Sequence, residues 1–339
     1  MTEAGVPTDL RQTMVGVLLA AVERGTNIAV LVSDSTSTAA IGPFAERFPE
    51  RLVNVGIAEQ NLMGVAAGMA LGGYIAVTAN AAPFVVNRAN EQLKNDVCYS
   101  ETNVKVVALN AGFAYANLAS THHAIDDISI VRGMGNILIF APSDALECEQ
   151  VFAFALAHTG PVYIRLDNVK FPPLHDPSYR FRPGAPDVLR EGTEGLVFSM
   201  GSVTCEAVTA VDGLRAAGRN VGLVNLPSLR PLDRATVAEL AAAHETIVTV
   251  EEHSIHGGIG SIVSEVMAEY GVGSRLVRLG IPEGQFAKAG PRAALRRHYG
   301  IDAAGITAAV TAALARDARE SITRGRTAPP TAAGKPDRG

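Results

Sequence analysis

Residues 54–61 read Asn-Val-Gly-Ile-Ala-Glu-Gln-Asn and place one carboxylate, Glu59, where an apolar run turns into an apolar helix. The preceding run, 52–55, has the length and composition of a buried strand. The following stretch, 62–70, is rich in small residues that suit close packing. An acid in this position can cap a helix by favouring the positive end of its dipole. Glu59 is therefore either a capping acid or a functional carboxylate that faces a core.

Working outward, apolar runs of strand length alternate with amphipathic stretches. In the first half of the chain these runs are 28–32, 52–55, 75–78, 104–109, 137–140 and 162–166. After a proline-rich interruption they resume at 195–200, 221–226 and 247–251, separated by helical stretches 205–217 and 234–243. This rhythm predicts two α/β domains with parallel sheets, the second smaller than the first.

The boundaries follow from composition. Pro172, Pro173, Pro177, Pro183 and Pro186 suit neither a helix nor a central strand, so they predict a linker. Near the C-terminus the chain becomes polar and contains Pro and Gly, which predicts disorder. The expected organisation is a first domain 8–170, a linker 171–190, a second domain 191–316 and a disordered tail 317–339.

Composition excludes several functions. The chain has 339 residues, 47% hydrophobic and 19% charged, enough to bury the cores of two domains. A net charge of −5 argues against broad binding to nucleic acid or to an anionic membrane. The apolar stretch 65–86 is broken by Gly72-Gly73, Asn80 and Pro83, so no membrane span is expected.

The three cysteines, Cys98, Cys148 and Cys205, are odd in number and lack ligand spacing, so neither a disulfide framework nor a zinc site is indicated. The first residues lack a basic region followed by an apolar stretch, so no secretory signal is expected. The reducing cytoplasm is the expected compartment.

The segment around Glu59 resembles the Gly-Ile-Ala-Glu-Gln motif in the pyrimidine-binding domain of transketolases and deoxyxylulose-phosphate synthases. The resemblance implies that thiamin diphosphate is the cofactor. It also implies that Glu59 is catalytic, hydrogen-bonding the pyrimidine nitrogen and promoting the imino tautomer. Such a role asks for a carboxyl group in a dry pocket, where low dielectric strengthens its hydrogen bond.

The second domain carries the same resemblance in residues 225–233, Asn-Leu-Pro-Ser-Leu-Arg-Pro-Leu-Asp, and in residues 249–260, Thr-Val-Glu-Glu-His-Ser-Ile-His-Gly-Gly-Ile-Gly. About residues 10 to 316 match the C-terminal half of a transketolase. The Gly-Asp-Gly segment with which the family holds magnesium does not occur in the sequence. We therefore expect one subunit of a split transketolase, in an α2β2 heterotetramer whose partner subunit supplies the diphosphate and Mg²⁺ half of each site.

Three further residues are expected at the cofactor. Phe84 matches an aromatic residue that packs on the pyrimidine, although a plain core role is the alternative. Arg88, in the same segment, is placed with it. Asp34 follows a strand end and matches an Asp near the thiazolium, or else caps a helix. The family has a second Phe where this chain has Ala81, so the pocket is expected to be roomier or differently filled.

The expected substrate contacts come from four strand ends. His122 matches the histidine of the Thr-His-Gln motif, which contacts substrate hydroxyls and can exchange protons near neutral pH. His123 replaces the Gln of that motif, and a metal pair with His122 is not expected because adjacent side chains diverge. Thr38 is expected to line the channel. Arg165 matches an arginine that grips phosphate, with an acidic partner, such as Asp167, as its alternative.

The sequence also departs from the family. Residues 116–119 read Ala-Asn-Leu-Ala where members usually have Gly-Glu-Asp-Gly, so the carboxylate that contacts a substrate hydroxyl is missing. Asn110 replaces a histidine that often helps to bind acceptor phosphate. These departures predict an acceptor other than the standard polyhydroxylated sugar phosphate.

Three functions are consistent with these residues. The first is a transketolase-like subunit that moves a two-carbon ketol unit from a ketose to an atypical aldehyde acceptor. The second is a decarboxylating enzyme subunit, like deoxyxylulose-phosphate synthases or the beta chain of 2-oxo acid dehydrogenases. The third is a non-catalytic partner of another thiamin enzyme, against which Glu59 and His122 argue. The first is preferred.

Overall fold

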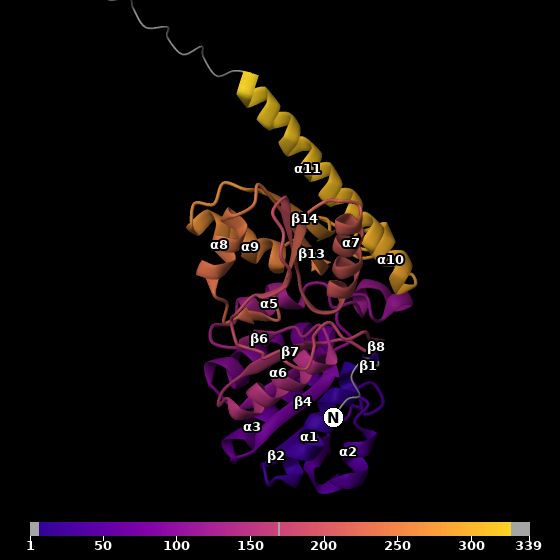
Figure 1. Ribbon diagram of the computed structural model, residues 1–339. Helices are drawn as coiled ribbons and strands as arrows, with labels where there is room; N and C mark the ends of the chain where they lie inside the picture. The colour runs from indigo at the N-terminus through magenta and orange to yellow at the C-terminus, as the bar shows by residue number, and fades with distance from the viewer. Residues whose placement is uncertain (1–6, 169, 327–339) are drawn as a thin grey trace, which may run out of the picture.

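The computed structural model describes residues 7–168 and 170–326, which form two α/β domains stacked end to end (Figure 1). The first domain runs from indigo to magenta in Figure 1, and the second is mostly orange. Both sheets are mainly parallel. The predicted fold class is therefore confirmed.

The first sheet contains seven strands in the order β12-β6-β7-β5-β4-β2-β3. Six are parallel neighbours: β2 (Ile28–Val32), β3 (Leu52–Asn54), β4 (Ile75–Ala81), β5 (Val104–Leu109), β6 (Leu138–Phe140) and β7 (Val162–Leu166). Strands β2, β5 and β7 are buried at every position, because helices cover both faces. This double burial explains why the strands read as continuous apolar runs.

Successive residues of a strand point to opposite faces, and β2 shows how this builds two apolar layers. Ile28, Val30 and Val32 pack in the layer of α1 and α6, whereas Ala29 and Leu31 pack in that of α3. The helical segments of this domain are α1 (Leu10–Glu23), α2 (Gly42–Arg47), α3 (Glu59–Leu71), α4 (Asn90–Gln92), α5 (Asp127–Arg132), α6 (Ala145–Ala157), two π-helices, Phe84–Arg88 and Leu93–Tyr99, and 3₁₀ turns at Pro49–Arg51 and Ala116–Thr121.

The second sheet has the order β14-β13-β10-β11-β9, with only β9 antiparallel to its neighbour. Its strands are β9 (Asp187–Arg190), β10 (Gly195–Ser199), β11 (Val221–Asn225), β13 (Thr246–Ser254) and β14 (Arg275–Ile281). The sequence analysis missed β9 and β14, because edge strands carry polar residues such as Arg190 and Arg278.

Helices cover both faces of this sheet as well. Val197 of β10 packs with α7 and α11, while Phe198 packs with α8 and α9. The helices are α7 (Thr204–Ala216), α8 (Arg234–Ala242), α9 (Ile259–Glu269), α10 (Arg292–His298) and α11 (Ala303–Arg326), with a 3₁₀ turn at Gly201–Val203. Throughout 7–168 and 170–326, every helix falls short of the length and apolarity that a membrane crossing requires.

Part of the expected tail is helical. Helix α11 continues to Arg326 and projects away from the body of the molecule in Figure 1. The expectation of disorder from residue 317 is therefore wrong for 317–326, because the Ala, Arg and Glu residues there favour a helix. Residues 327–339 lie outside the described residues.

The two domains exchange structure at their boundary. Strand β12 (Ser228–Arg230) follows β11 of the second sheet but pairs antiparallel with β6 of the first. A two-stranded sheet of β1 (Thr8–Asp9) and β8 (Lys170–Phe171) closes the first domain near its ends. The domains are consequently joined by backbone pairing as well as by side chains.

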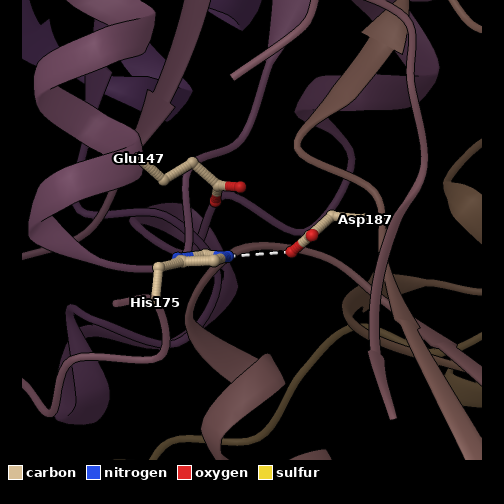
Figure 2. Close-up of side chains that lie close together, drawn as sticks. All are labelled: Glu147, His175 and Asp187. Carbon is tan, nitrogen blue, oxygen red and sulfur yellow. Dashed lines mark hydrogen bonds and ion pairs between the residues drawn. The ribbon is translucent and has the colours of Figure 1, made fainter. Parts of the chain in front are cut away.

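The linker is fixed by a buried ionic cluster (Figure 2). His175 lies between the carboxylates of Asp144 in the first domain and Asp187 in β9, at 2.9 and 2.8 Å from its Nδ1 and Nε2. Burial acts to lower the pKa of His175, but the hydrogen bonds to both carboxylates raise it to about 10. Glu147 lies beside them, and burial raises its pKa to about 7. Both imidazole nitrogens are used, so His175 acts as a cation that joins the domains.

Replacing His175 with Asn should therefore destabilise the chain. Because the folded pKa is raised above the ordinary value of 6.5, the stabilisation is complete below pH 6.5 and is lost as pH rises through about 10. We expect a loss of about 3 kcal/mol at pH 6, shrinking as pH approaches 10. Calorimetric melting of both proteins across this range measures it. A difference that is constant with pH would contradict the ionic role.

Candidate active site

The loop before Glu59 is tied to the end of β2. Ser33 Oγ donates to Gly56 O at 2.6 Å and accepts from Ala58 N at 2.9 Å. Asn54 Oδ1 accepts from Asp34 N at 3.1 Å and from Gly56 N at 3.0 Å. Gly56 has a φ of +74°, a conformation that favours glycine. These bonds fix the start of α3 against the carboxyl end of the sheet, where parallel α/β folds bind ligands.

Glu59 is the first residue of α3 and is only 2% exposed. Its Oε2 accepts from Arg88 Nη1 at 2.8 Å. The guanidinium carbon of Arg88 lies 4.4 Å from the centre of the Phe84 ring, so the arginine contacts both predicted cofactor residues. Phe84 and Arg88 begin and end a π-helix, a form that is frequent at functional sites. A buried carboxylate, a guanidinium and an aromatic ring are thus brought together.

His122 extends this group. Its ring meets the edge or face of Phe84 at 5.3 Å and of Tyr115 at 5.5 Å between centroids. Thr121 Oγ1 lies 2.9 Å from His122 Nδ1. Within the described chain Nε2 has no recorded hydrogen bond, so it can contact a ligand. The structure therefore places both predicted catalytic residues, Glu59 and His122, on either side of Phe84 and Arg88.

Tyr115 links His122 to the remaining predicted residues. Burial raises the pKa of its hydroxyl, while hydrogen bonds from Asn110 and Thr38 and the charge of Arg11 act in the opposite direction. Arg11 donates from Nη1 to Thr38 O at 3.0 Å. The sequence analysis missed Tyr115 and Arg11, because their roles depend on loops that meet only in the folded chain.

Asp34 is exposed at the mouth of this region and has a φ of +52°. It borders an open hollow of about 650 Å³ that Thr36, Ser37 and Gly42 also line. Asp34 therefore stands at a solvent-accessible edge of the site, next to the loop of Glu59.

Two predicted substrate residues lie elsewhere. Arg165 is 4% exposed and donates to Asp127 Oδ2 at 2.9 Å, to Ala124 O at 2.8 Å and to Glu252 O at 3.0 Å. The prediction that it grips phosphate is wrong for this structure, because its guanidinium is buried among protein acceptors. Its alternative, an acidic partner, holds, but the partner is Asp127.

His123 is also buried, 1% exposed, and packs against Phe113 with centroids 5.4 Å apart. Its Nε2 lies 2.9 Å from Ala116 O, and burial lowers its pKa. Adjacent side chains diverge, so His122 faces the site while His123 supports the loop from below. The predicted substrate contact of His123 is therefore wrong here.

The assembled residues fit the ring end of a heterocyclic cofactor. Glu59 Oε1 has no recorded partner among the described residues, which leaves an acceptor for a ring nitrogen or an amino group. At the ends of β4 and β5, the buried atoms Asn80 Nδ2 and Asn110 Oδ1 also lack partners within the described chain. Such orphaned groups are costly unless a ligand or water satisfies them. Phe84 offers a partly exposed aromatic face beside them.

A prediction separates the structural role of Arg165 from a role in substrate binding. Arg165→Met leaves Asp127 buried without its cation, so we expect the free energy of unfolding to fall by about 3 kcal/mol. The melting temperature measures this. A variant with unchanged melting and a raised KM for an anionic substrate would instead restore the phosphate role.

Comparison with known proteins defines the family. The family model for the pyrimidine-binding domain of transketolase matches residues 7–172, and that for the transketolase C-terminal domain matches residues 184–306. One of the subunits of the apulose-4-phosphate transketolase of Actinobacillus succinogenes is 52% identical over 87% of this chain and 94% of its own length.

Two further proteins are similar over most of their length. The 6-deoxy-6-sulfo-D-fructose transketolase subunit of a Clostridium species is 32% identical over 77% of this chain and 81% of its own. A solved structure described as a split gene transketolase, inactive beta4 tetramer, is 36% identical with a TM-score of 0.83, covering 91% of this chain and 98% of that one. The chain belongs to the transketolase family, with the pyrimidine-binding and C-terminal domains of a split member.

Proposed function

We propose that this chain is the subunit of a thiamin diphosphate-dependent transketolase that supplies Glu59 and His122 to a shared active site. The enzyme would transfer a two-carbon ketol unit from a ketose to an aldehyde acceptor. The observation that carries the proposal is the contact series Glu59, Arg88, Phe84, His122, in which a buried carboxylate and an imidazole flank an aromatic face.

Glu59, Phe84, Arg88 and Asp34 would hold the cofactor. Bound thiamin diphosphate would supply the electron sink for breaking and making the carbon–carbon bond. Glu59 would hold a proton between Oε1 and a ring nitrogen, in a position shielded from water by α3. Phe84 would bury one ring face. Arg88 is half exposed, so it can move from Glu59 without disturbing the core.

The substrate would be bound by His122 and its neighbours. His122 Nε2 would hydrogen-bond a substrate hydroxyl, with the ring oriented by Thr121 and Tyr115. Since Arg165 is buried, Arg11 beside Thr38 is the cation best placed for an anionic substituent. Leu118, half exposed, stands where many family members have a carboxylate. An acceptor with fewer hydroxyl contacts is therefore favoured.

The names of the relatives support an unusual substrate. They refer to apulose-4-phosphate and to 6-deoxy-6-sulfo-D-fructose, each a sugar with an anionic group. We extend only the class to this chain: a small ketose or aldose with a phosphate or sulfonate.

The partner subunit would bind the diphosphate and Mg²⁺, in an α2β2 heterotetramer. Two observations support this: the Actinobacillus relative is named as one of several transketolase subunits, and the similar beta4 tetramer is described as inactive. The cytoplasm is the proposed compartment, since Cys98, Cys148 and Cys205 are free thiols.

Replacing Glu59 with Gln tests the assignment. The amide keeps the shape but cannot hold a proton in the same way, so we expect turnover of the reconstituted complex to fall about 100- to 10,000-fold. Glu91→Gln, an exposed change on α4, is the matched control. Calorimetric titration of cofactor and Mg²⁺ should show that both complexes still bind them. Unimpaired turnover of the Glu59 variant would leave the chain as a non-catalytic partner.

Replacing His122 probes the substrate side. His122→Ala should lower kcat/KM for the sugar about 100-fold, because a positioned hydroxyl contact is lost. His122→Asn should recover part of this, since its amide can still donate. The His123→Asn variant, at a residue that faces the interior, should affect melting more than KM. Equal kinetic effects at both positions would count against the assignment of His122.

A further inference from the structure

The segment of residues 110–125, here called the substrate segment, connects β5 to α5 and carries Asn110, Tyr115 and His122. It belongs to the first domain, but the residues that hold it come largely from the second. Building on the proposed function, we infer that the second domain sets the conformation of the substrate segment and that Glu252 of β13 is the positioning residue through which it does so.

Glu252 meets the base of the substrate segment. Its side chain is 1% exposed, and Oε1 accepts from Phe113 N at 2.6 Å. Gly112 has a φ of +59°, and a Cβ there would lie 2.6 Å from Oε1, so the backbone and carboxylate are in close contact. Gly112 and Ala124 exchange two hydrogen bonds of 3.1 Å, which close the segment into a loop. Displacing the carboxylate would therefore shift the point from which this loop starts.

The carboxylate is itself rigidly held. Arg292 Nε donates to Oε1 at 2.8 Å and Arg296 Nε donates to Oε2 at 2.6 Å, both from α10. Arg292 also pairs with Asp167 at the end of β7. Burial opposes ionisation of Glu252, but the charges of Arg292 and Arg296 lower its pKa. Two guanidinium groups and one amide thus leave Glu252 little freedom to move.

The second domain also contacts the rest of the loop. The contacts are Ser254 N with Ile125 O (2.7 Å), Ser120 Oγ with Ala287 O (3.0 Å), Gly290 N with Ala116 O (3.5 Å) and the stacked rings of Phe113 and Tyr299 (5.5 Å between centroids). They are distributed along the segment from its base to the turn before His122. The segment is therefore clamped on one side, while His122 and Tyr115 face the site on the other.

The backbone of the segment needs such support. Asn110, Ala116 and Ala119 have φ values of 60°, 45° and 58°, in the left-handed region that alanine in particular rarely adopts. Strained residues persist where the surrounding structure determines their conformation, and they cluster at functional sites. Without the clamp, the segment would relax and His122 would move away from Phe84.

Glu252→Gln, assembled with the partner subunit, tests the inference. The amide retains the volume and one acceptor oxygen but loses the charge that holds both arginines. We expect kcat/KM for the sugar substrate to fall about 10- to 100-fold, because a small displacement of a positioned group costs this much. Cofactor affinity by fluorescence titration should change less than about twofold, since Glu59 and Phe84 lie outside the segment. Hydrogen exchange of peptides from 112–124 should accelerate.

The matched control is Glu206→Gln, which removes another carboxylate from Arg296, 3.2 Å from Nη1, without touching the substrate segment. It should leave kcat/KM and exchange of 112–124 unchanged. If Glu252→Gln does not fold, Gly112→Ala provides the second test, because the added methyl group must push the carboxylate away. It should lower kcat/KM in the same way.

Unchanged kcat/KM in a folded Glu252→Gln or Gly112→Ala complex would overturn the inference, as would an equal loss of cofactor affinity. The outcome is separable from that of the proposed function. If Glu59→Gln retains turnover, the proposed function fails, while hydrogen exchange still reports whether Glu252 orders the segment. If Glu59→Gln abolishes turnover and Glu252→Gln does not lower kcat/KM, only the positioning role fails.

Discussion

The buried carboxylate of Glu252 is the interaction on which the rest of this structure depends. It lies at the meeting point of the two sheets, where α10 supplies two guanidinium groups and the first domain supplies a backbone amide. Breaking a buried ion pair is costly, because the remaining charge has lost both water and its partner. The relative placement of the domains is therefore strongly specified at this point.

A second buried pair reinforces the same boundary. Arg165 and Asp127 join β7 to α5, and Arg165 also donates to the main chain of Ala124 and Glu252. Tyr163 adds a hydrogen bond of 2.8 Å to Asp127. With the His175 cluster at the linker, charged side chains lie in the interior mainly where the domains meet. Such groups have strict geometric requirements, so they favour one arrangement over others of similar apolar burial.

This division of labour has a functional meaning. The first domain provides strand ends, on which Glu59, Phe84 and His122 gather at one edge of the sheet. The second domain provides few groups that face this site, yet it contacts the segment carrying His122 along its length. A reaction that depends on carbon atoms held at close approach requires such rigidity of the supporting loop. Different second-domain loops could therefore tune substrate choice without changing the catalytic carboxylate.

The sequence by itself determined the fold class, most strands and the cofactor side of the site, because hydrophobic periodicity and the 54–61 motif are local signals. Edge strands β9 and β14 escaped it, since polar residues there hide the periodicity. Only the tertiary structure decided the fate of Arg165 and His123. Whether a charged or polar side chain faces a ligand or the interior depends on partners distant in sequence, here Asp127 and the loop at Ala116. The same long-range contacts brought Tyr115, Arg11 and Glu252 to positions that no local pattern could indicate.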